Sequence, residues 1–570
     1  MKPFLVTALQ AAKMPRWLLL LLCVLYAVPG LVGRDPWRME DAAGFGIAWT
    51  MARGEQGLLD WLLPNVVGQP VYSEGPLPFW LGALTARLLP GLPADALIRS
   101  AAIVWLGGLF VALWYAVWRL ARRPGVQPAD PFGASASHVD YGRAIADCAL
   151  LLLLATLGLL ARSHETTAEA AQVAWIGVFL FGLALTPERP WAGGLVVGLA
   201  IGATTLTRGL PLAMALGAVT LALPVWVGAF RWVARPFLGA AWPLALLLSA
   251  AWPVALTLAG PPGTAHLSAW LAWNLDSVSG PSLEALTYAL RTLPWYLWPA
   301  WPLGLWTLWR WRDRLNEPAL AVPLLTAIGI GAVALLAPEP SESIWVPLAP
   351  ATAMIGALGI PTIRRGITSL IDWFAVMSFT LIGLVLWSYW IAFQTGWPPK
   401  MAFRAQQSVL GWTPSIQVLE LALGLAVTLA WVGLIVWRIS RQRSGMWRTV
   451  MLPAGGLVLT WCLLMTLWLP AGNHRKTYRD VAQSAGAQVV DRSACVQAVG
   501  LDLAQRATFA YFGGLRIDDR RTDCEWLLIA DRVAFPRLVS ETPGNWTQVW
   551  RGQRPTDRRE RFRLFRREPG

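Results

Sequence analysis

Residues 16–41 read RWLLLLLCVLYAVPGLVGRDPWRMED, an apolar run that ends in a cluster of charged residues. A helix needs about 20 apolar residues to cross a bilayer, and stretches of this kind recur from Leu18 to Leu469. The first run has no small-residue cleavage site before Gly33-Arg34-Asp35. We therefore interpret it as a retained first helix and not as a removed signal peptide.

The composition places most of the chain in lipid. Of the 570 residues, 56% are hydrophobic and only 14% are charged, and the mean hydropathy is +0.48. Soluble domains of this size do not show such a balance. The sequence therefore predicts an all-α polytopic membrane protein.

Basic residues set the predicted orientation, because short cytoplasmic loops hold Lys and Arg while translocated loops do not. Lys2, Lys13 and Arg16 place the N-terminus in the cytoplasm. This register predicts about thirteen helices in a bacterial-type inner membrane, with a periplasmic C-terminus. The basic loops that follow predicted inward crossings contain Arg119/Arg122/Arg123, Arg231/Arg235, Arg310/Arg312/Arg314, Arg364/Arg365 and Arg438/Arg441/Arg443.

The chain divides in two near Gly472. Residues 1–471 form the predicted transmembrane domain, and residues 472–570 have ordinary polarity. The second part has candidate strands at 488–490, 496–499 and 526–530 and a candidate helix at 503–512, so it predicts a small extracytoplasmic α/β domain. Cys495 and Cys524 fall in this domain, where an oxidising compartment would allow a disulfide; the sequence leaves open whether they pair.

The formal net charge of +14 does not indicate a nucleic-acid partner, because most of the excess lies in the cytoplasmic loops and in the basic tail 551–567. The four histidines are far apart in sequence, and no CxxC or HExxH pattern occurs, so no metal site is predicted. We expect membrane lipids as partners and a monomeric chain.

The first outer loop, residues 34–96, is long for so hydrophobic a chain, and long loops in compact architectures usually carry function. Its acidic pair Glu40-Asp41 is followed by the apolar stretch 42–51, which predicts a helix along the membrane surface. Such a helix would hold both carboxylates at the water boundary. The alternative is that the pair only caps the helix, since acids favour its positive N-terminal end.

Three stretches of the first 210 residues carry a family resemblance. Arg34-Asp35-Pro36-Trp37-Arg38-Met39-Glu40-Asp41-Ala42 is the first, and Asp60-Trp61-Leu62-Leu63-Pro64 with Gly68-Gln69-Pro70 and Ser73-Glu74-Gly75-Pro76 is the second. Arg99 and Thr207-Arg208-Gly209 form the third. Together they resemble the GT-C glycosyltransferases, in particular the protein O-mannosyltransferase and lipid A aminoarabinose transferase group, whose loop has an Asp-Glu pair and a "DWLVP…NG.PY.EKPP" segment.

The sequence departs from this family at Gly75, where the family pattern has a lysine that is expected to meet the donor phosphate. A basic group must then come from elsewhere. Arg208 matches the family's "TKG" element, and Arg162, Lys400 and Arg404 are the other candidates. An arginine at a helix end can equally be a membrane anchor.

The resemblance implies transfer of a sugar from a polyprenyl phosphate to an acceptor hydroxyl, with inversion and with no cofactor or metal. It assigns Glu40 as the base and Asp41 as its orienting neighbour, although adjacency leaves the two interchangeable. Asp35, Glu74 and Arg99 join Arg162 and Arg208 as expected substrate-binding residues. We expect His164 and Glu165, at the outer end of the third predicted span, to bind substrate as well.

The acceptor could be lipid A, another glycolipid or a protein. Two other functions stay open on the sequence. A lipid-linked-sugar flippase would also be polytopic, but transporters place polar groups near the midplane and often show repeats. A ligase or polymerase of surface polysaccharide is the second.

Overall fold

The computed structural model describes residues 6–127, 135–440, 445–519, 521, 523–530, 545–554 and 557–568. Within these residues nine helical segments are long and apolar enough to cross a membrane. They are α5 (Ala94–Ala121), α8 (Ala168–Leu185), α9 (Pro190–Thr207), α12 (Ala234–Leu258), α16 (Pro318–Leu335), the segment Glu342–Thr362 with α18 (Ala349–Gly359), α19 (Arg365–Thr395), α21 (Val418–Ser440) and α22 (Arg448–Leu467).

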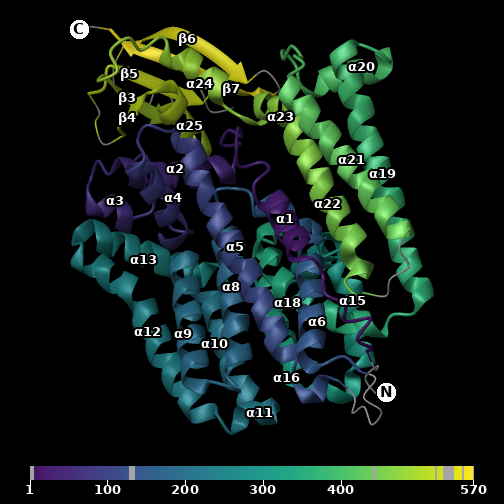
Figure 1. Cartoon of the computed structure of the whole chain (residues 1–570). Helices are drawn as coiled ribbons and strands as arrows, with labels where there is room; N and C mark the ends of the chain where they lie inside the picture. The colour runs from purple at the N-terminus through teal and green to yellow at the C-terminus, as the bar shows by residue number, and fades with distance from the viewer. Residues whose placement is uncertain are drawn as a thin grey trace.

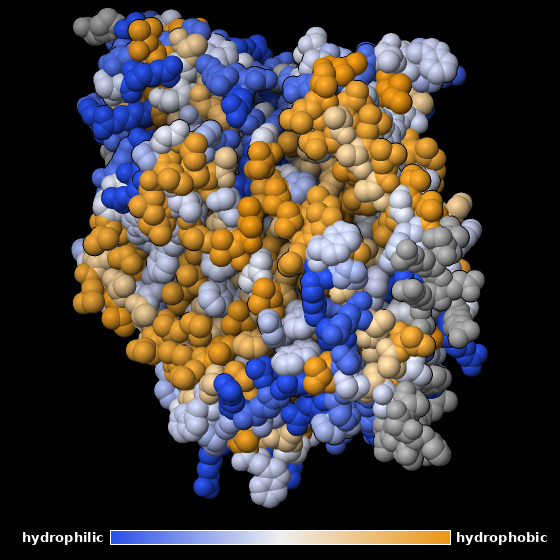
Figure 2. Space-filling view, in the orientation of Figure 1, coloured by the Kyte–Doolittle hydropathy of each residue, from blue (hydrophilic) through white to orange (hydrophobic). Residues whose placement is uncertain are grey.

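The predicted polytopic all-α fold is confirmed. An apolar band crosses the visible face, and polar residues gather above and below it (Figure 2). The sequence predicts about thirteen spans; beyond the nine, α1 (Arg16–Ala27) and α10 (Leu210–Trp226) are apolar but shorter. Two further bundle helices, α6 (His138–Leu154) and α15 (Ala300–Arg310), are also short.

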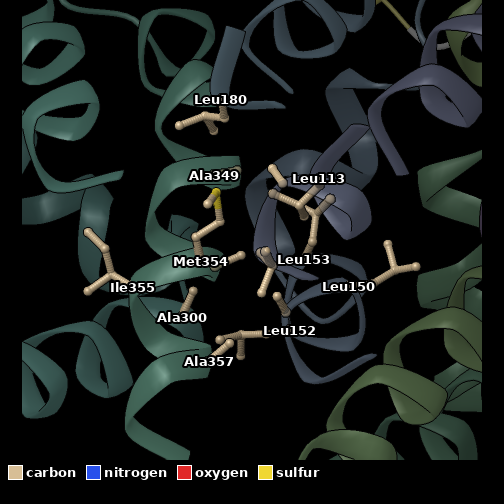
Figure 3. Close-up of a cluster of buried hydrophobic side chains, with 14 of the residues drawn as sticks. Leu113, Leu150, Leu152, Leu153, Leu180, Ala300, Ala349, Met354, Ile355 and Ala357 are labelled. Atoms are coloured by element: carbon tan, nitrogen blue, oxygen red, sulfur yellow. The ribbon is translucent and has the colours of Figure 1, made fainter. Parts of the chain in front are cut away.

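The bundle core is made of aliphatic side chains from helices that are distant in sequence. Leu113 of α5, Leu153 of α6 and Leu180 of α8 meet Met354 of α18 in one buried cluster (Figure 3). Lipid is as apolar as these side chains, so van der Waals packing holds such helices together. Gly194, Gly198 and Gly202 of α9 let α12 approach so closely that a Cβ at each would overlap α12 atoms. This packing fixes α9 against α12.

The first outer loop folds into a layer at the upper end of the bundle, beneath the C-terminal domain (Figure 1). Its elements are α2 (Glu40–Arg53), α3 (Leu58–Leu62), β1 (Asn65–Val66), β2 (Gln69–Pro70) and α4 (Leu77–Leu88). The predicted helix at 42–51 is present as α2, which begins at Glu40, and its position along the membrane surface stays a prediction. Three shorter helices, α7 (Leu157–Arg162), α13 (Pro261–Asp276) and α14 (Leu283–Tyr296), precede or follow membrane segments. Which compartment this end faces stays a prediction.

The C-terminal domain is a five-stranded mixed sheet with two helices. After α23 (Leu469–Lys476), the sheet has the strand order β4-β3-β5-β7-β6, in which β3 is parallel to β4 and β5 while β7 is antiparallel to β5 and β6. The bounds are α24 (Arg479–Gly486), β3 (Cys495–Val499), α25 (Leu503–Gly513), β4 (Arg516–Ile517), β5 (Trp526–Ala530), β6 (Trp546–Arg554) and β7 (Asp557–Arg567).

The predicted strands at 496–499 and 526–530 and the helix at 503–512 are confirmed as β3, β5 and α25. The predicted strand at 488–490 is wrong: the amides of Gln488 and Val489 donate back to the end of α24 in turns, and Val490 is 90% exposed. Cys495 and Cys524 form a disulfide.

The basic tail was not recognised as strands. In β7 the side chains of Phe562 and Leu564 are fully buried while arginines alternate with them, the period-two pattern of a half-buried strand. Residues 555 and 556 of the predicted tail lie outside the described residues.

Candidate functional site

Asp41 lies in the first turn of α2 and is 2% exposed. Its Oδ2 is 3.1 Å from an Arg34 Nη and 3.6 Å from an Arg99 Nη, and it accepts the Trp37 N–H at 2.9 Å. Its Oδ1 accepts the Thr166 N–H at 2.7 Å. Asp41, Arg34 and Arg99 are named here the Asp41 anchor.

The anchor keeps Asp41 ionised although burial alone raises the pKa of its carboxyl. Arg34 and Arg99, with the N–H groups of Thr166 and Trp37, outweigh that burial and hold the pKa below its usual value. Arg99 also donates to the Arg34 carbonyl, so both arginines are tied to the start of the loop. Every Asp41 oxygen is occupied, which suits a positioning residue better than a base.

Glu40 precedes Asp41 but has the opposite environment. Its side chain is 53% exposed and pairs with Arg162 at the end of α7. Arg162 also contacts Glu165, at 3.2 Å between an Nη and Oε2. The residue before Glu40, Met39, has φ 70°, a backbone conformation that is costly for a residue with a side chain. A strained backbone therefore positions Glu40 at the surface of the loop layer.

A second group of charges lies within electrostatic reach of Glu40. Arg208, which follows α9, is 2.8 Å from Glu169 Oε1 and 3.4 Å from Glu74 Oε1. The negative charge of Glu40 interacts electrostatically with both Glu74 and Arg208. We name these six residues, Glu40, Glu74, Glu165, Glu169, Arg162 and Arg208, the glutamate–arginine cluster.

The cluster has more carboxylates than it can neutralise. Burial raises the pKa of Glu74 to about 7 against the opposing effect of Arg208, and burial likewise raises the pKa of Glu165 to about 7, helped by Asp41 and opposed by Arg162. One oxygen of Glu74 and one of Glu169 are buried without a hydrogen-bond partner. Such groups are typical of sites that bind or react.

The close packing around Gly75 explains why this position cannot hold the lysine of the family pattern. Its N–H donates to the Thr207 carbonyl at 3.0 Å, and a Cβ on it would overlap the Leu206 carbonyl. No side chain fits there without a backbone shift. The contact places Glu74 beside Arg208. The guanidinium of Arg208 thus lies close to position 75, where the family pattern has a lysine.

Asp35 is hydrogen-bonded to residues of the C-terminal domain. Its carboxylate accepts from Nε of Arg479 at 2.9 Å and from a second Arg479 nitrogen, and its N–H donates to Asn473. The ring N–H of Trp37 also donates to Asn473, at 3.0 Å. Asp35 thus joins the loop to the C-terminal domain.

His164 is fully buried away from the cluster. Both ring nitrogens lie 2.6 Å from carbonyl oxygens, those of Leu160 and Tyr26, so neither faces an open space. The other candidate cations, Lys400 and Arg404, are exposed on α20 (Pro399–Ser408) and form no ion pair within the described chain.

Arg208 also lines a cavity of about 430 Å³ between the ends of α9, α13 and α16. Trp273 and Asp276 of α13 form part of its wall, as do Ser341 and Ser343. The cavity shares Pro211 and Val333 with an apolar groove of about 910 Å³ between α10, α13 and α16. A largely apolar chamber with an arginine at one side thus adjoins an apolar channel.

Sequence reasoning brought Glu40, Glu74, Arg162, Glu165 and Arg208 together, and it missed Glu169, Arg34 and Arg479. Glu169 is 1% exposed near the start of α8. An acid in an otherwise apolar span is energetically costly, and this feature of the sequence could have identified Glu169 as a candidate. Among the described residues no three His, Cys, Asp or Glu side chains are grouped to hold a metal ion.

No protein-family model matches the chain, and no curated protein matches its sequence. Solved structures do match. ArnT from Cupriavidus metallidurans bound to undecaprenyl phosphate is 14% identical with a TM-score of 0.67, over 97% of this chain and 98% of that one. The apo form of the same ArnT is 14% identical with a TM-score of 0.62, over 96% and 97%. The chain therefore has the GT-C fold that the resemblance predicts.

Proposed function

We propose that this GT-C protein transfers a sugar from a polyprenyl phosphate to an acceptor hydroxyl at the upper end of the bundle, with Glu40 as the general base. The observation that carries the proposal is the position of Arg208. It belongs to the glutamate–arginine cluster and also lines the cavity that adjoins the apolar groove. A single ligand with an anionic head and a long apolar chain fits both spaces.

The apolar groove suits a prenyl chain. It is lined by Leu210, Met214, Leu275 and Ile328, of which Met214 and Leu275 are 69% and 77% exposed. Side chains this apolar are stable in contact with lipid, and a chain lying in the groove keeps that contact. The ArnT structure with the same fold contains undecaprenyl phosphate, which supports a donor of this class.

The phosphate needs a cation that the chain does not supply at Gly75. Arg208 can supply it, because guanidinium groups match phosphate oxygens in geometry and remain charged. In the present structure Glu74 and Glu169 occupy Arg208. Since the pKa of Glu74 is about 7, protonation of Glu74 would free one side of Arg208 for the phosphate.

In the transfer step, Glu40 and Arg208 of the cluster have separate roles. The Glu40 carboxylate accepts the proton of the acceptor hydroxyl, and the hydroxyl oxygen forms a bond to the anomeric carbon. The bond from that carbon to the phosphate oxygen breaks, and its electron pair leaves with the phosphate, where Arg208 stabilises the charge. One displacement inverts the anomeric centre. Because the lipid phosphate is itself the leaving group, the step requires no nucleotide or metal.

The test compares cells that lack the chain with cells that express it or its Glu40→Gln variant. Envelope lipids and glycoproteins are analysed by mass, with lipid A, other glycolipids and proteins as the acceptor classes. We expect one species to lose the mass of a glycosyl unit both without the chain and with Glu40→Gln. The matched control is Glu284→Gln, an exposed glutamate at the start of α14.

A glycosylated product that persists in the Glu40→Gln cells at normal expression contradicts the proposal. Loss of the product only without the chain, and not with Glu40→Gln, points to a flippase. Polymer shortening in place of a missing single unit points to a ligase or polymerase.

A further inference from the structure

A polar cavity, separate from the cavity at Arg208, lies between the first outer loop and the C-terminal domain. It measures about 150 Å³ and is lined by the C-terminal half of α2, by α3 and the β1–β2 hairpin, and by α25 and β4. At roughly 30 Å³ per water molecule it holds about five waters or one sugar ring. Neither Glu40 nor Arg208 lines it.

Two buried charged groups of this cavity lack a full set of partners. Asp60 is 1% exposed and accepts only the Gln56 N–H at 2.8 Å and a weak 3.5 Å bond from Asn65, with no ion pair in the part of the chain that the structure describes. Arg506 is 3% exposed; it pairs with Asp519, but its Nε is buried without a partner. Buried polar groups of this kind normally have partners, so the cavity is incomplete without a ligand.

The hairpin at the cavity wall is strained. Val67 has φ 49°, in the left-handed region that a β-branched residue rarely adopts, and the following Gly68 has φ 83°. The Val67 N–H is held by the Thr50 hydroxyl of α2 at 3.0 Å. Strain retained by surrounding contacts is found mostly at functional sites. Here it shapes the wall that carries Asn65 and Gly68.

The lining groups match a saccharide better than an ion. The lining includes a carboxylate at Asp60, an amide at Asn65 and a hydroxyl at Thr50, and Trp49 adds an aromatic side chain. No three acidic, His or Cys side chains of the described chain are grouped for a metal. The Arg53 guanidinium covers the Trp49 ring at 4.7 Å, and it is itself 38% exposed, so a sugar ring can replace it.

The cavity has a fixed distance from the proposed base. Trp49 and Arg53 are nine and thirteen residues along α2 from Glu40. At 1.5 Å per residue the cavity lies about 14–20 Å from Glu40. One rigid helix therefore sets the separation between the two sites, and a ligand that reaches both must be longer than a single sugar.

We infer that this cavity is a saccharide-binding subsite for the acceptor, in which a sugar ring packs on Trp49 and hydrogen-bonds Asp60, Asn65 and Arg506 while a remote hydroxyl of the same glycan reaches Glu40. That the bound sugar belongs to the acceptor rests on the proposed function. That the cavity binds a sugar rests on the cavity alone. The inference also gives the C-terminal domain a role, because Arg506 comes from α25.

The test measures binding, not transfer. Maltotriose, mannotriose and triacetylchitotriose are each titrated, by saturation-transfer NMR, against the full chain in lipid nanodiscs. We expect at least one of them to bind with a millimolar or lower Kd. Asp60→Asn should weaken that binding about tenfold, the value of a hydrogen bond to a charged group. Trp49→Ala should weaken it similarly, while Trp49→Phe, which keeps a ring, should retain it.

Thermal unfolding of each variant shows whether it is folded. Glu284→Gln should bind the trisaccharide as the wild type does, because Glu284, an exposed residue of α14, does not line the cavity. Failure of the proposed function would appear as transfer by Glu40→Gln and would leave this result unaffected. The inference is overturned if none of the trisaccharides binds, if folded Trp49→Ala and Asp60→Asn bind undiminished, or if an unglycosylated serine-rich peptide binds there instead.

Discussion

Glu40 and Asp41 are neighbours at the start of α2, yet they belong to two different ionic groups. In the Asp41 anchor a single carboxylate that is 2% exposed receives two arginines and two backbone N–H groups. In the glutamate–arginine cluster four carboxylates share two arginines, and Glu40 is 53% exposed. Both oxygens of the anchor carboxylate are occupied, whereas the cluster has unused carboxylate oxygens and an open side.

The difference teaches that adjacent acids of similar chemistry can have separate roles. A carboxylate with every oxygen occupied and a lowered pKa cannot readily accept a proton, but it can hold a loop in place. A carboxylate with one flexible partner and access to solvent can accept one. The pair is therefore not interchangeable in the structure, and variants on each side should behave differently.

The largest effect on stability is expected on the anchor side. Arg99→Met removes one cation from a fully buried group, leaving the Asp41 charge less compensated. Breaking such a pair costs about 3–5 kcal/mol. Chemical unfolding of the purified protein in detergent should show this loss.

The matched control for that variant is Arg87→Met, an exposed arginine on α4. It should unfold within about 0.5 kcal/mol of wild type. Equal stability of the Arg99 and Arg87 variants would mean that the anchor does not hold the loop.

On the cluster side the largest effect is expected from Arg208→Gln. Loss of a cation that stabilises the leaving phosphate lowers turnover by about 10²–10³-fold. Transfer measured in proteoliposomes with the natural lipid extract gives the rate. Arg291→Gln, an exposed arginine of α14, is the control and should keep wild-type turnover. Wild-type turnover by Arg208→Gln would exclude it as the phosphate ligand.

A smaller effect is expected from pH. The pKa values of Glu74 and Glu165 are raised to about 7 in the folded chain from an ordinary 4.5, so the folded state holds their protons more tightly than the unfolded state. Stability then falls as pH rises from about 4.5 to about 7, by about 2.5 kcal/mol for each of the two carboxyls.

Thermal unfolding from pH 4.5 to 8 measures this slope. The double variant Glu74→Gln with Glu165→Gln should flatten it, since neither side chain then titrates. A slope of the opposite sign, or one that the double variant leaves unchanged, would place the titrating groups elsewhere.

The smallest effect is expected at the junction of the two groups. Met39, 71% exposed, has φ 70° directly before Glu40. Glycine adopts this conformation without a steric penalty, so Met39→Gly should raise stability by about 1 kcal/mol. Met39→Ala, which keeps the strain, is the control. Equal stability of the two variants would show that no strain is stored there.

The sequence alone predicted most of the local secondary structure. Apolar length predicts the bundle, the acidic pair before an apolar stretch predicts α2, and alternation predicts β3 and β5. It did not recognise β6 and β7, because their arginines alternate with few apolar residues and only the contact with β5 shows which side is buried. The strand assigned to 488–490 failed because the local pair Val489-Val490 resembles a strand, although the chain there turns back on α24.

The division between Glu40 and Asp41 could not be predicted, because it depends on contacts far along the chain. Arg99 is 58 residues from Asp41, and the Thr166 N–H is 125 residues away. The family resemblance supplied the pair, but the packing of the loop against α5 and the segment after α7 decides which acid is buried.

The most direct test of the account measures turnover and unfolding free energy on the same preparations of two single variants, Glu40→Gln and Asp41→Asn. We predict that Glu40→Gln loses about 10²–10⁴-fold in turnover and unfolds within about 0.5 kcal/mol of wild type. Asp41→Asn should instead lose about 3–5 kcal/mol of stability. A Glu40→Gln protein that keeps its turnover, or an Asp41→Asn protein that is fully stable but inactive, would contradict the division of roles.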